Sequence, residues 1–175
     1  MRAAVSVIEM IEEFVNGSFS NERSRIIVPE LSRLVMRVRN ARVPLFFIAD
    51  CHRPWDKELD IMGEHTIYGT KGARPIKEFE SKGEKLIGKR SYSAFFNSYL
   101  ERELNVLGLD TVILTGVLTD IYIHHTAADA FYRGFDAIVP TDRVASLDDD
   151  TQKRALEEMV SLYGATLILS RELVF

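Results

Sequence analysis

An aspartate and two histidines in the first half of the chain have the residue types and spacing of metal ligands. Asp50 and His52 are separated by one residue, and His65 follows thirteen residues after His52. Side chains two residues apart at a strand end point the same way, so Asp50 and His52 could share one ion while His65 folds back as a third ligand. Two imidazoles and a carboxylate suit zinc with open coordination positions, or iron or manganese. The alternative is a solvated loop with an incidental Asp-x-His. We favour the metal site, with Cys51 pointing to the opposite side as a packing residue.

A second acid and a lysine are also placed where they could take part in chemistry. Glu9 directly follows a short apolar segment and could be a general base, because partial burial would raise its pKa; the competing interpretation is an ordinary polar residue at a loop start. Lys89 ends a G-x-x-x-x-G-K sequence, but Arg90 stands where a phosphate loop needs Ser or Thr, so we reject that motif. Lys89 could instead steady a developing negative charge, although exposure at the surface is the commoner fate of a lysine.

A glycine turn at residues 116–120 leads into a helical pattern. Backbone N–H groups at a helix start have no partner within the helix, and they can form an oxyanion hole. A nucleophile would be expected there, and the side chain in that position is Tyr122. His124 and His125 follow about 100° apart on the same helix, so at most one of them can face the strand ends. We interpret both as helix-surface or core histidines.

Strands and helices alternate along the chain and must bring these residues together. Apolar runs predict strands over residues 3–8, 43–49, 85–87, 111–117, 135–140 and 165–169. Helical spacing predicts helices over residues 29–42, 94–107, 119–133 and 150–163. The long polar stretch between residue 50 and about residue 83 is typical of a functional loop.

This alternation predicts an α/β fold of three layers, α-β-α, with a six-stranded, mainly parallel sheet. We find no repeat or linker-like segment, so residues 1–175 are expected to form a single domain. Ligands of such folds bind outside the carboxyl ends of the strands, which is where the residues above are predicted to lie.

Composition excludes several classes of protein. Apolar residues make up 46% of the 175 residues and charged residues 27%, with 22 Lys and Arg against 26 Asp and Glu. The net charge of −4 argues against a disordered chain and against a nucleic-acid-binding protein. The longest apolar run is too short to span a membrane, and we expect no membrane partner and a cytoplasmic location. A single cysteine excludes an internal disulfide.

With these residues in place, the chain resembles the isochorismatase-like superfamily of cysteine hydrolases, which includes nicotinamidases, and in particular its N-carbamoylsarcosine amidase-like branch. The likeness covers essentially the whole chain. Four ordered segments carry it: Ile8-Glu9-Met10 through Phe14, Asp50-x-His52 with Glu64-His65 through Ala73, Lys89-Arg90-x-Tyr92-Ser93-Ala94-Phe95, and Gly116-Val117-x-Thr119-Asp120 with Thr126-Ala127-x-Asp129-Ala130.

The resemblance implies roles for particular residues. In such enzymes a cysteine attacks an amide carbon, an aspartate takes the thiol proton and a lysine supports both. These positions are occupied here by Tyr122, Glu9 and Lys89 respectively. The resemblance further implies an oxyanion hole formed by the backbone of Leu118 and Tyr122, and a substrate pocket that contains Phe14.

The resemblance also implies a cofactor and partners. Asp50, His52 and His65 match the family's metal ligands, which hold a divalent metal, usually zinc, that binds and orients the substrate. The expected ligand is a small amide or carboxylate. A homodimer or homotetramer is expected as well, because family sites often border a subunit interface.

Two of the three triad positions differ from the family pattern. Glutamate in place of aspartate adds a methylene, and a displacement of about 1 Å can lower a proton-transfer rate about 10²-fold. Tyrosine in place of cysteine removes the nucleophile, because a phenol of pKa about 10 does not replace a thiol of pKa about 8.5. Loss of a covalent nucleophile lowers rates on the order of 10³–10⁶-fold, so cysteine-dependent amide hydrolysis is not expected.

Three hypotheses follow, in order of preference. The chain keeps the fold and metal site but is weak or inactive as an enzyme and binds a small ligand or a partner. Alternatively it is a hydrolase that needs no thiol, as isochorismatases are, with Glu9 as acid and Lys89 as charge stabiliser. In the third hypothesis the metal activates water and Glu9 is the base.

Overall fold

The predicted strands form one parallel sheet in the computed structural model, which describes residues 2–175. The order across the sheet is β3-β2-β1-β4-β5-β7, and β6 pairs with the carboxyl end of β4. The strands are β1 (Ala3–Ile8), β2 (Leu45–Asp50), β3 (Lys85–Lys89), β4 (Thr111–Val117), β5 (Asp136–Pro140), β6 (Val144–Ala145) and β7 (Thr166–Ile168). The predicted parallel sheet is therefore confirmed, and the two-residue β6 is an addition to its six strands.

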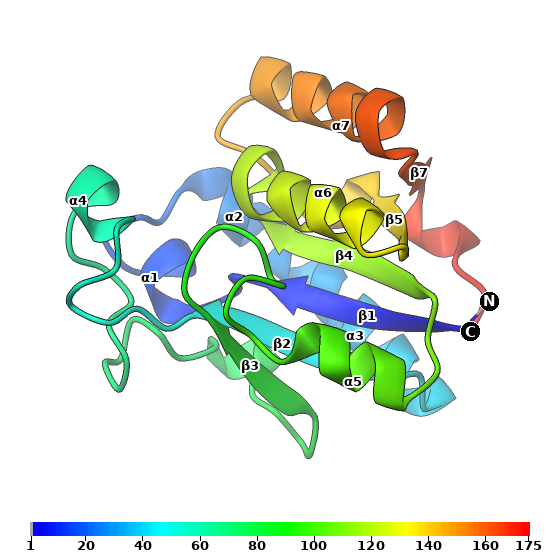
Figure 1. The fold of residues 1–175 in the computed structure, drawn as a ribbon, viewed down its shortest axis with the longest axis horizontal. Coiled ribbons are helices and arrows are strands. Elements are labelled where there is room, and N and C mark those ends of the chain that lie inside the picture. The colour runs from blue at the N-terminus through cyan, green and yellow to red at the C-terminus, as the bar shows by residue number, and fades with distance from the viewer. Residues whose placement is uncertain (1) are drawn as a thin grey trace.

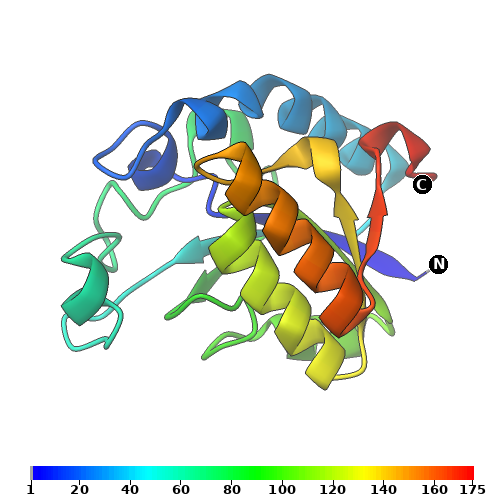
Figure 2. The same ribbon diagram turned by 90° about the horizontal axis from the view of Figure 1, so that it is seen from above.

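Helices cover both faces of this sheet. Figures 1 and 2 show α3 on one face and α5, α6 and α7 on the other, which is the predicted three-layer arrangement. None of the helices in residues 2–175 has the length and apolarity needed to cross a membrane. The helices are α1 (Glu12–Val15), α2 (Glu22–Ile26), α3 (Val28–Ala41), α4 (Leu59–Met62), α5 (Leu100–Val106), α6 (His124–Tyr132) and α7 (Asp149–Tyr163).

The central strands are buried along their whole length. Every residue of β1, β2 and β4 is buried, which explains why apolar residues occupy both faces of these strands rather than alternate positions. The helix α3 contributes one apolar stripe to this core, at i, i+3, i+4 and i+7 spacing. The members of this stripe are Leu31, Leu34, Val35 and Val38.

One predicted helix is shorter in the structure than the periodicity suggested. The helix expected over residues 94–107 begins only at Leu100, because Asn97 has a left-handed backbone with φ of 49°. The backbone N–H of Ala94 donates to the side-chain hydroxyl of Thr126 in α6 at 2.9 Å. Residues 94–99 are therefore not helical, and the N–H of Ala94 is bonded to a side chain of α6 instead.

The direction in which the chain crosses the sheet reverses between β1 and β4. From β1 the chain proceeds to β2 on one side, whereas from β4 it proceeds to β5 on the other side. Such a reversal leaves the adjacent loops pointing apart, and ligands of open α/β sheets bind there. Gly116 of β4 has φ of 109°, and a Cβ atom on it would lie 2.0 Å from the carbonyl oxygen of Ile8. Glycine is therefore required for β4 to approach β1 this closely.

Candidate active site and metal centre

The carboxyl ends of three neighbouring strands bring two acids and a lysine together. Glu9 follows β1, and Asp50 and Lys89 are paired at the ends of β2 and β3. Lys89 Nζ lies 2.9 Å from Glu9 Oε1, forms an ion pair with Asp50 Oδ1 and donates to the carbonyl of Ser91 at 2.9 Å. All three charged side chains are completely buried. Because buried charges need partners, these three groups form one electrostatic unit.

The charges of this unit shift one another's proton affinity. Burial, together with the negative charge of Asp50, raises the pKa of Glu9 to about 8. Burial disfavours the charge on Asp50, but the Lys89 ammonium outweighs that effect and lowers the pKa of Asp50 below its usual value. Burial also opposes the charge on Lys89, yet the two carboxyl groups hold its pKa above the usual value. Burial and the charge of Asp50 thus favour the protonated form of Glu9, whereas Lys89 favours the anionic form of Asp50.

Glu9 has a backbone conformation that few residues other than glycine adopt. Its φ is 56°, in the left-handed region. Its N–H donates to the carbonyl of Ile48 at 2.9 Å, and its Oε2 accepts the N–H of Asp50 at 3.2 Å. The end of β2 thus fixes both the backbone and the carboxyl group of Glu9. Strained backbone held in this way is characteristic of functional positions.

Tyr122 lies beside this unit, in the turn that follows β4. Residues Thr119–Ile123 form one π-helical turn ahead of α6, where the sequence predicted ordinary helix. The Tyr122 ring is completely buried, with its centre 4.2 Å from Lys89 Nζ. Its hydroxyl has no hydrogen-bond partner within residues 2–175. Burial raises the pKa of the phenol well above its ordinary value, so Tyr122 is neutral.

Two further residues expected at the site lie next to Tyr122. The buried ring of Phe14 packs edge-on against Tyr122, with ring centres 5.4 Å apart, and lies 6.1 Å from the His65 ring. Phe14 therefore lies between His65 and the Tyr122 ring, which itself packs against Lys89. Leu118 joins β4 to the π-helical turn, after a cis peptide bond between Val117 and Leu118.

The three predicted metal ligands also come together, and a fourth acid joins them. Asp50, His52, Glu58 and His65 are all buried, and one ligand atom from each lies within 4.8 Å of the others. Glu58 immediately precedes α4 and was missed by the sequence analysis. A search of the loop for any carboxylate after His52 would have included it, but its direction depends on how the loop folds.

The residues present fit a metal ion. Buried oxygen and nitrogen atoms without hydrogen-bond partners face one another here: Asp50 Oδ2, His52 Nε2, both Glu58 carboxylate oxygens and His65 Nε2. The other ring nitrogen of each histidine is occupied, at 3.3 Å from Asp56 Oδ2 for His52 and 2.8 Å from the Gly63 carbonyl for His65. Unpartnered buried polar atoms are costly without a ligand, so this arrangement is suited to a cation.

The remaining histidines and the cysteine lie outside this group of ligands. His124 lies 3.3 Å from Glu158 of α7, and His125 is bonded to the Ile121 carbonyl of its own helix turn. Cys51 is half-buried against Gly88 of β3 and takes no part in the ligand cluster.

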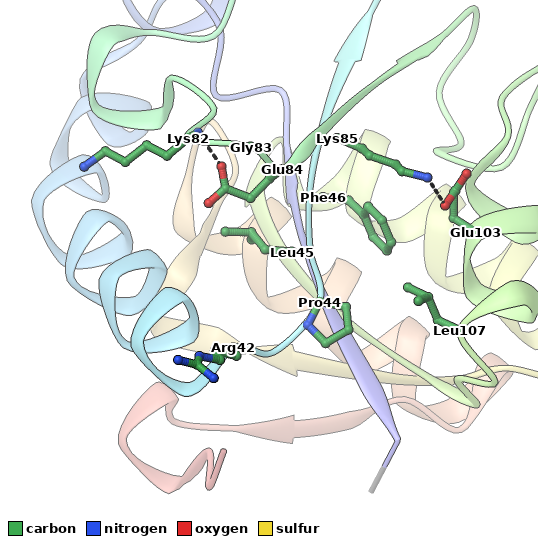
Figure 3. Close-up of a pocket in the computed structure, with 10 residues that line it drawn as sticks. All are labelled: Arg42, Pro44, Leu45, Phe46, Lys82, Gly83, Glu84, Lys85, Glu103 and Leu107. Atoms are coloured by element: carbon green, nitrogen blue, oxygen red, sulfur yellow. Dashed lines mark hydrogen bonds and ion pairs between the residues drawn. The ribbon is translucent and has the colours of Figure 1, made fainter.

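A separate pocket of about 510 Å³ lies at the opposite, amino end of β2 and β3 (Figure 3). Pro44, Leu45 and Phe46 form part of its wall, and its Lys85 is already paired with Glu103. It contains neither histidine nor cysteine, so we place the chemistry at the carboxyl ends of the strands.

Comparison with known proteins gives one consistent assignment. The structure of N-carbamoylsarcosine amidase from Thermoplasma acidophilum is 34% identical, covers 100% of both chains and superposes with a TM-score of 0.93. The pyrazinamidase/nicotinamidase of Streptococcus mutans is 30% identical, with a TM-score of 0.86 over 95% of this chain and 99% of that one. Nicotinamidase 3 of Arabidopsis thaliana is 28% identical over 88% of this chain and 78% of its own length. The isochorismatase domain matches residues 3–172. The chain belongs to the isochorismatase family.

Membership confirms the resemblance seen in the sequence motifs. The protein is an isochorismatase-family hydrolase-fold protein related to nicotinamidases and carbamoyl amidases. The three-layer fold with its parallel sheet is the family fold.

Proposed function

We propose that this protein is a metal-binding isochorismatase-family member that does not catalyse cysteine-dependent amide hydrolysis. The observation that carries the proposal is the Tyr122 ring, which is buried against Lys89 and Phe14. From the resemblance of the sequence motifs, we infer that this ring stands where the family has its nucleophilic thiol. A neutral phenol whose pKa is raised by burial is a poor nucleophile. The ring also fills the space beside Lys89.

The metal centre is the part of the family site that we propose is retained. Asp50, His52, Glu58 and His65 would hold the ion. We propose zinc, because two imidazoles with carboxylate oxygens are among its common ligand sets. When bound, the metal would polarise an oxygen or nitrogen of a small amide or carboxylate ligand.

A second candidate function is acid-base hydrolysis that needs no thiol. It is favoured by the position of Glu9, whose carboxyl group lies 2.9 Å from Lys89, and by the burial that raises its pKa to about 8. Glu9 could then donate a proton to a leaving group, while Lys89 at 2.9 Å stabilises negative charge.

The decisive test compares the wild type with Tyr122→Cys on a panel of small amides, including nicotinamide and N-carbamoyl amino acids. We expect no hydrolysis by the wild type and measurable hydrolysis by Tyr122→Cys. Adding Glu9→Asp to that variant should raise the rate about 10²-fold, because it shortens the acid by one methylene. Tyr92→Cys is the matched control, since Tyr92 is a neighbouring ring 6.2 Å from Tyr122.

Two outcomes would overturn the proposal. Amide hydrolysis by the wild type at a rate near that of Tyr122→Cys would show that no thiol is needed. Turnover of an enol ether by the wild type, lost in Glu9→Gln and unaffected by chelators, would establish the second candidate instead.

A further inference from the structure

Asp56 lies outside the group of metal ligands but contacts one of them. Its Oδ2 is 3.3 Å from Nδ1 of His52 and also accepts the backbone N–H of Arg53 at 2.9 Å. Nε2, which faces Asp50 and Glu58 without a bond, is the other nitrogen of the same ring. A carboxylate that accepts the Nδ1 proton fixes the tautomer in which Nε2 carries the free electron pair.

Arg90 in turn holds Asp56 in place. Its Nε lies 3.1 Å and 3.2 Å from the two carboxylate oxygens of Asp56, and its Nη2 pairs with Oδ1. The Asp56 side chain is only 5% exposed, which protects this pair from solvent. Because Arg90 directly follows β3, an unbroken series of contacts runs from the sheet through Asp56 to the ring of His52.

We propose that Asp56 is a positioning residue for the metal ligand His52 and that Arg90 fixes Asp56 for this role. The inference rests on the proposed metal centre. Partners of this kind orient the ligating ring and raise its basicity, and their loss lowers metal affinity by about 10- to 100-fold. His65 is supported differently, by the backbone carbonyl of Gly63, so a change at Asp56 leaves that ligand intact.

The surroundings of Asp56 and Arg90 should allow proteins with substitutions at these positions to fold. Asp56 and Arg90 line a pocket of about 280 Å³ together with Trp55 and Phe96. The Arg90 side chain is 34% exposed, so shortening it leaves space that solvent can fill rather than an apolar void.

The test measures the Zn²⁺ affinity of the metal-free full-length protein by competition with a chromophoric chelator. The variants are Asp56→Ala, Asp56→Asn and Arg90→Gln. The matched control is Asp60→Asn, because Asp60 lies four residues further along, in α4, and is also in an ion pair, at 2.7 Å from Lys57, but does not contact the histidines. Co²⁺ absorption spectra of each variant report the geometry of the bound ion independently.

We expect Asp56→Ala to bind Zn²⁺ about 10- to 100-fold more weakly than the wild type, with an altered Co²⁺ spectrum. Asp56→Asn and Arg90→Gln should show smaller losses, and Asp60→Asn none. If Asp56→Ala fails to fold by circular dichroism, Asp56→Asn and Arg90→Gln decide the question.

The failures of the two proposals can be told apart. If the wild type binds no stoichiometric Zn²⁺, the proposed metal centre is wrong and the positioning role falls with it. If the wild type binds Zn²⁺ and every folded Asp56 and Arg90 variant binds it equally well, the centre stands and the positioning role is overturned. Equal losses in Asp56→Ala and Asp60→Asn would also overturn it, since they would reflect a general effect of removing a carboxylate from this segment.

Discussion

Tyr122 combines a completely buried ring with a hydroxyl that has no hydrogen-bond partner in residues 2–175. An unsatisfied buried hydroxyl destabilises a folded protein by about 1–3 kcal/mol. We therefore predict that Tyr122→Phe leaves the free energy of unfolding unchanged or raises it by about 1 kcal/mol, as measured in urea. The control is Tyr99→Phe, which loses a hydrogen bond to the Leu86 carbonyl at 2.9 Å and should lower stability slightly. A clear loss in Tyr122→Phe would mean that the hydroxyl has a partner.

Gly116 is a second position where adding or removing one atom is expected to change stability. A Cβ atom there would lie 2.0 Å from the Ile8 carbonyl oxygen, in a backbone with φ of 109°. Gly116→Ala is predicted to lower stability by about 3 kcal/mol or more and the melting temperature by about 6–12 °C. Gly134→Ala provides the comparison, because Gly134 also has positive φ but open space around it. If both variants lower the melting temperature equally, the positive φ and not the contact with Ile8 would explain the loss of stability.

At the level of elements, an ion pair joins α3 to the start of β3. Arg39 Nε lies 2.6 Å and its Nη2 3.2 Å from the two carboxylate oxygens of Glu84. Burial opposes the charge of Glu84, but the bonds from Arg39 outweigh it and lower the pKa from 4.5 to about 2. A carboxyl group whose pKa is lowered by folding adds stability above its unfolded pKa, and this contribution disappears as the pH falls through the folded pKa.

Glu84→Gln should therefore be less stable than the wild type by about 1 kcal/mol above pH 5, with the difference shrinking toward zero near pH 2. Urea unfolding at a series of pH values measures it. Glu157→Gln, which changes an exposed carboxylate 3.9 Å from Lys153, should show no comparable dependence. A constant difference between Glu84→Gln and wild type across this range would contradict the prediction.

At the level of the whole molecule, the proposed metal centre links β2 to the loop that carries Glu58 and His65. A ligand that binds only the folded state at about 100 times its Kd adds about 2.7 kcal/mol of stability. Zn²⁺ is thus predicted to raise the melting temperature by about 5–10 °C, and chelation to reverse this. Glu58→Gln together with His65→Ala should abolish the shift, and Mg²⁺ should produce little. An unchanged melting temperature in the wild type would count against the centre.

The sequence by itself determined the sheet and the candidate residues at its edge. The predominantly apolar runs of β1 and β4 predicted their bounds, because a strand covered on both faces is apolar on both faces and does not alternate. Asp50 and His52 could be assigned to one site for a different reason: they stand two residues apart at the end of a strand, so their side chains point the same way.

Only the tertiary structure decided which of these residues meet, and which others join them. Glu58 and Asp56 lie in a loop without periodicity, so nothing in their sequence indicates that they face His52. Burial of Lys89 between two acids and of the Tyr122 ring beside it depends on the pairing of strands distant along the chain. Local patterns report whether a segment is buried, whereas the partners of a buried charge are set by the packing of segments that the sequence keeps far apart.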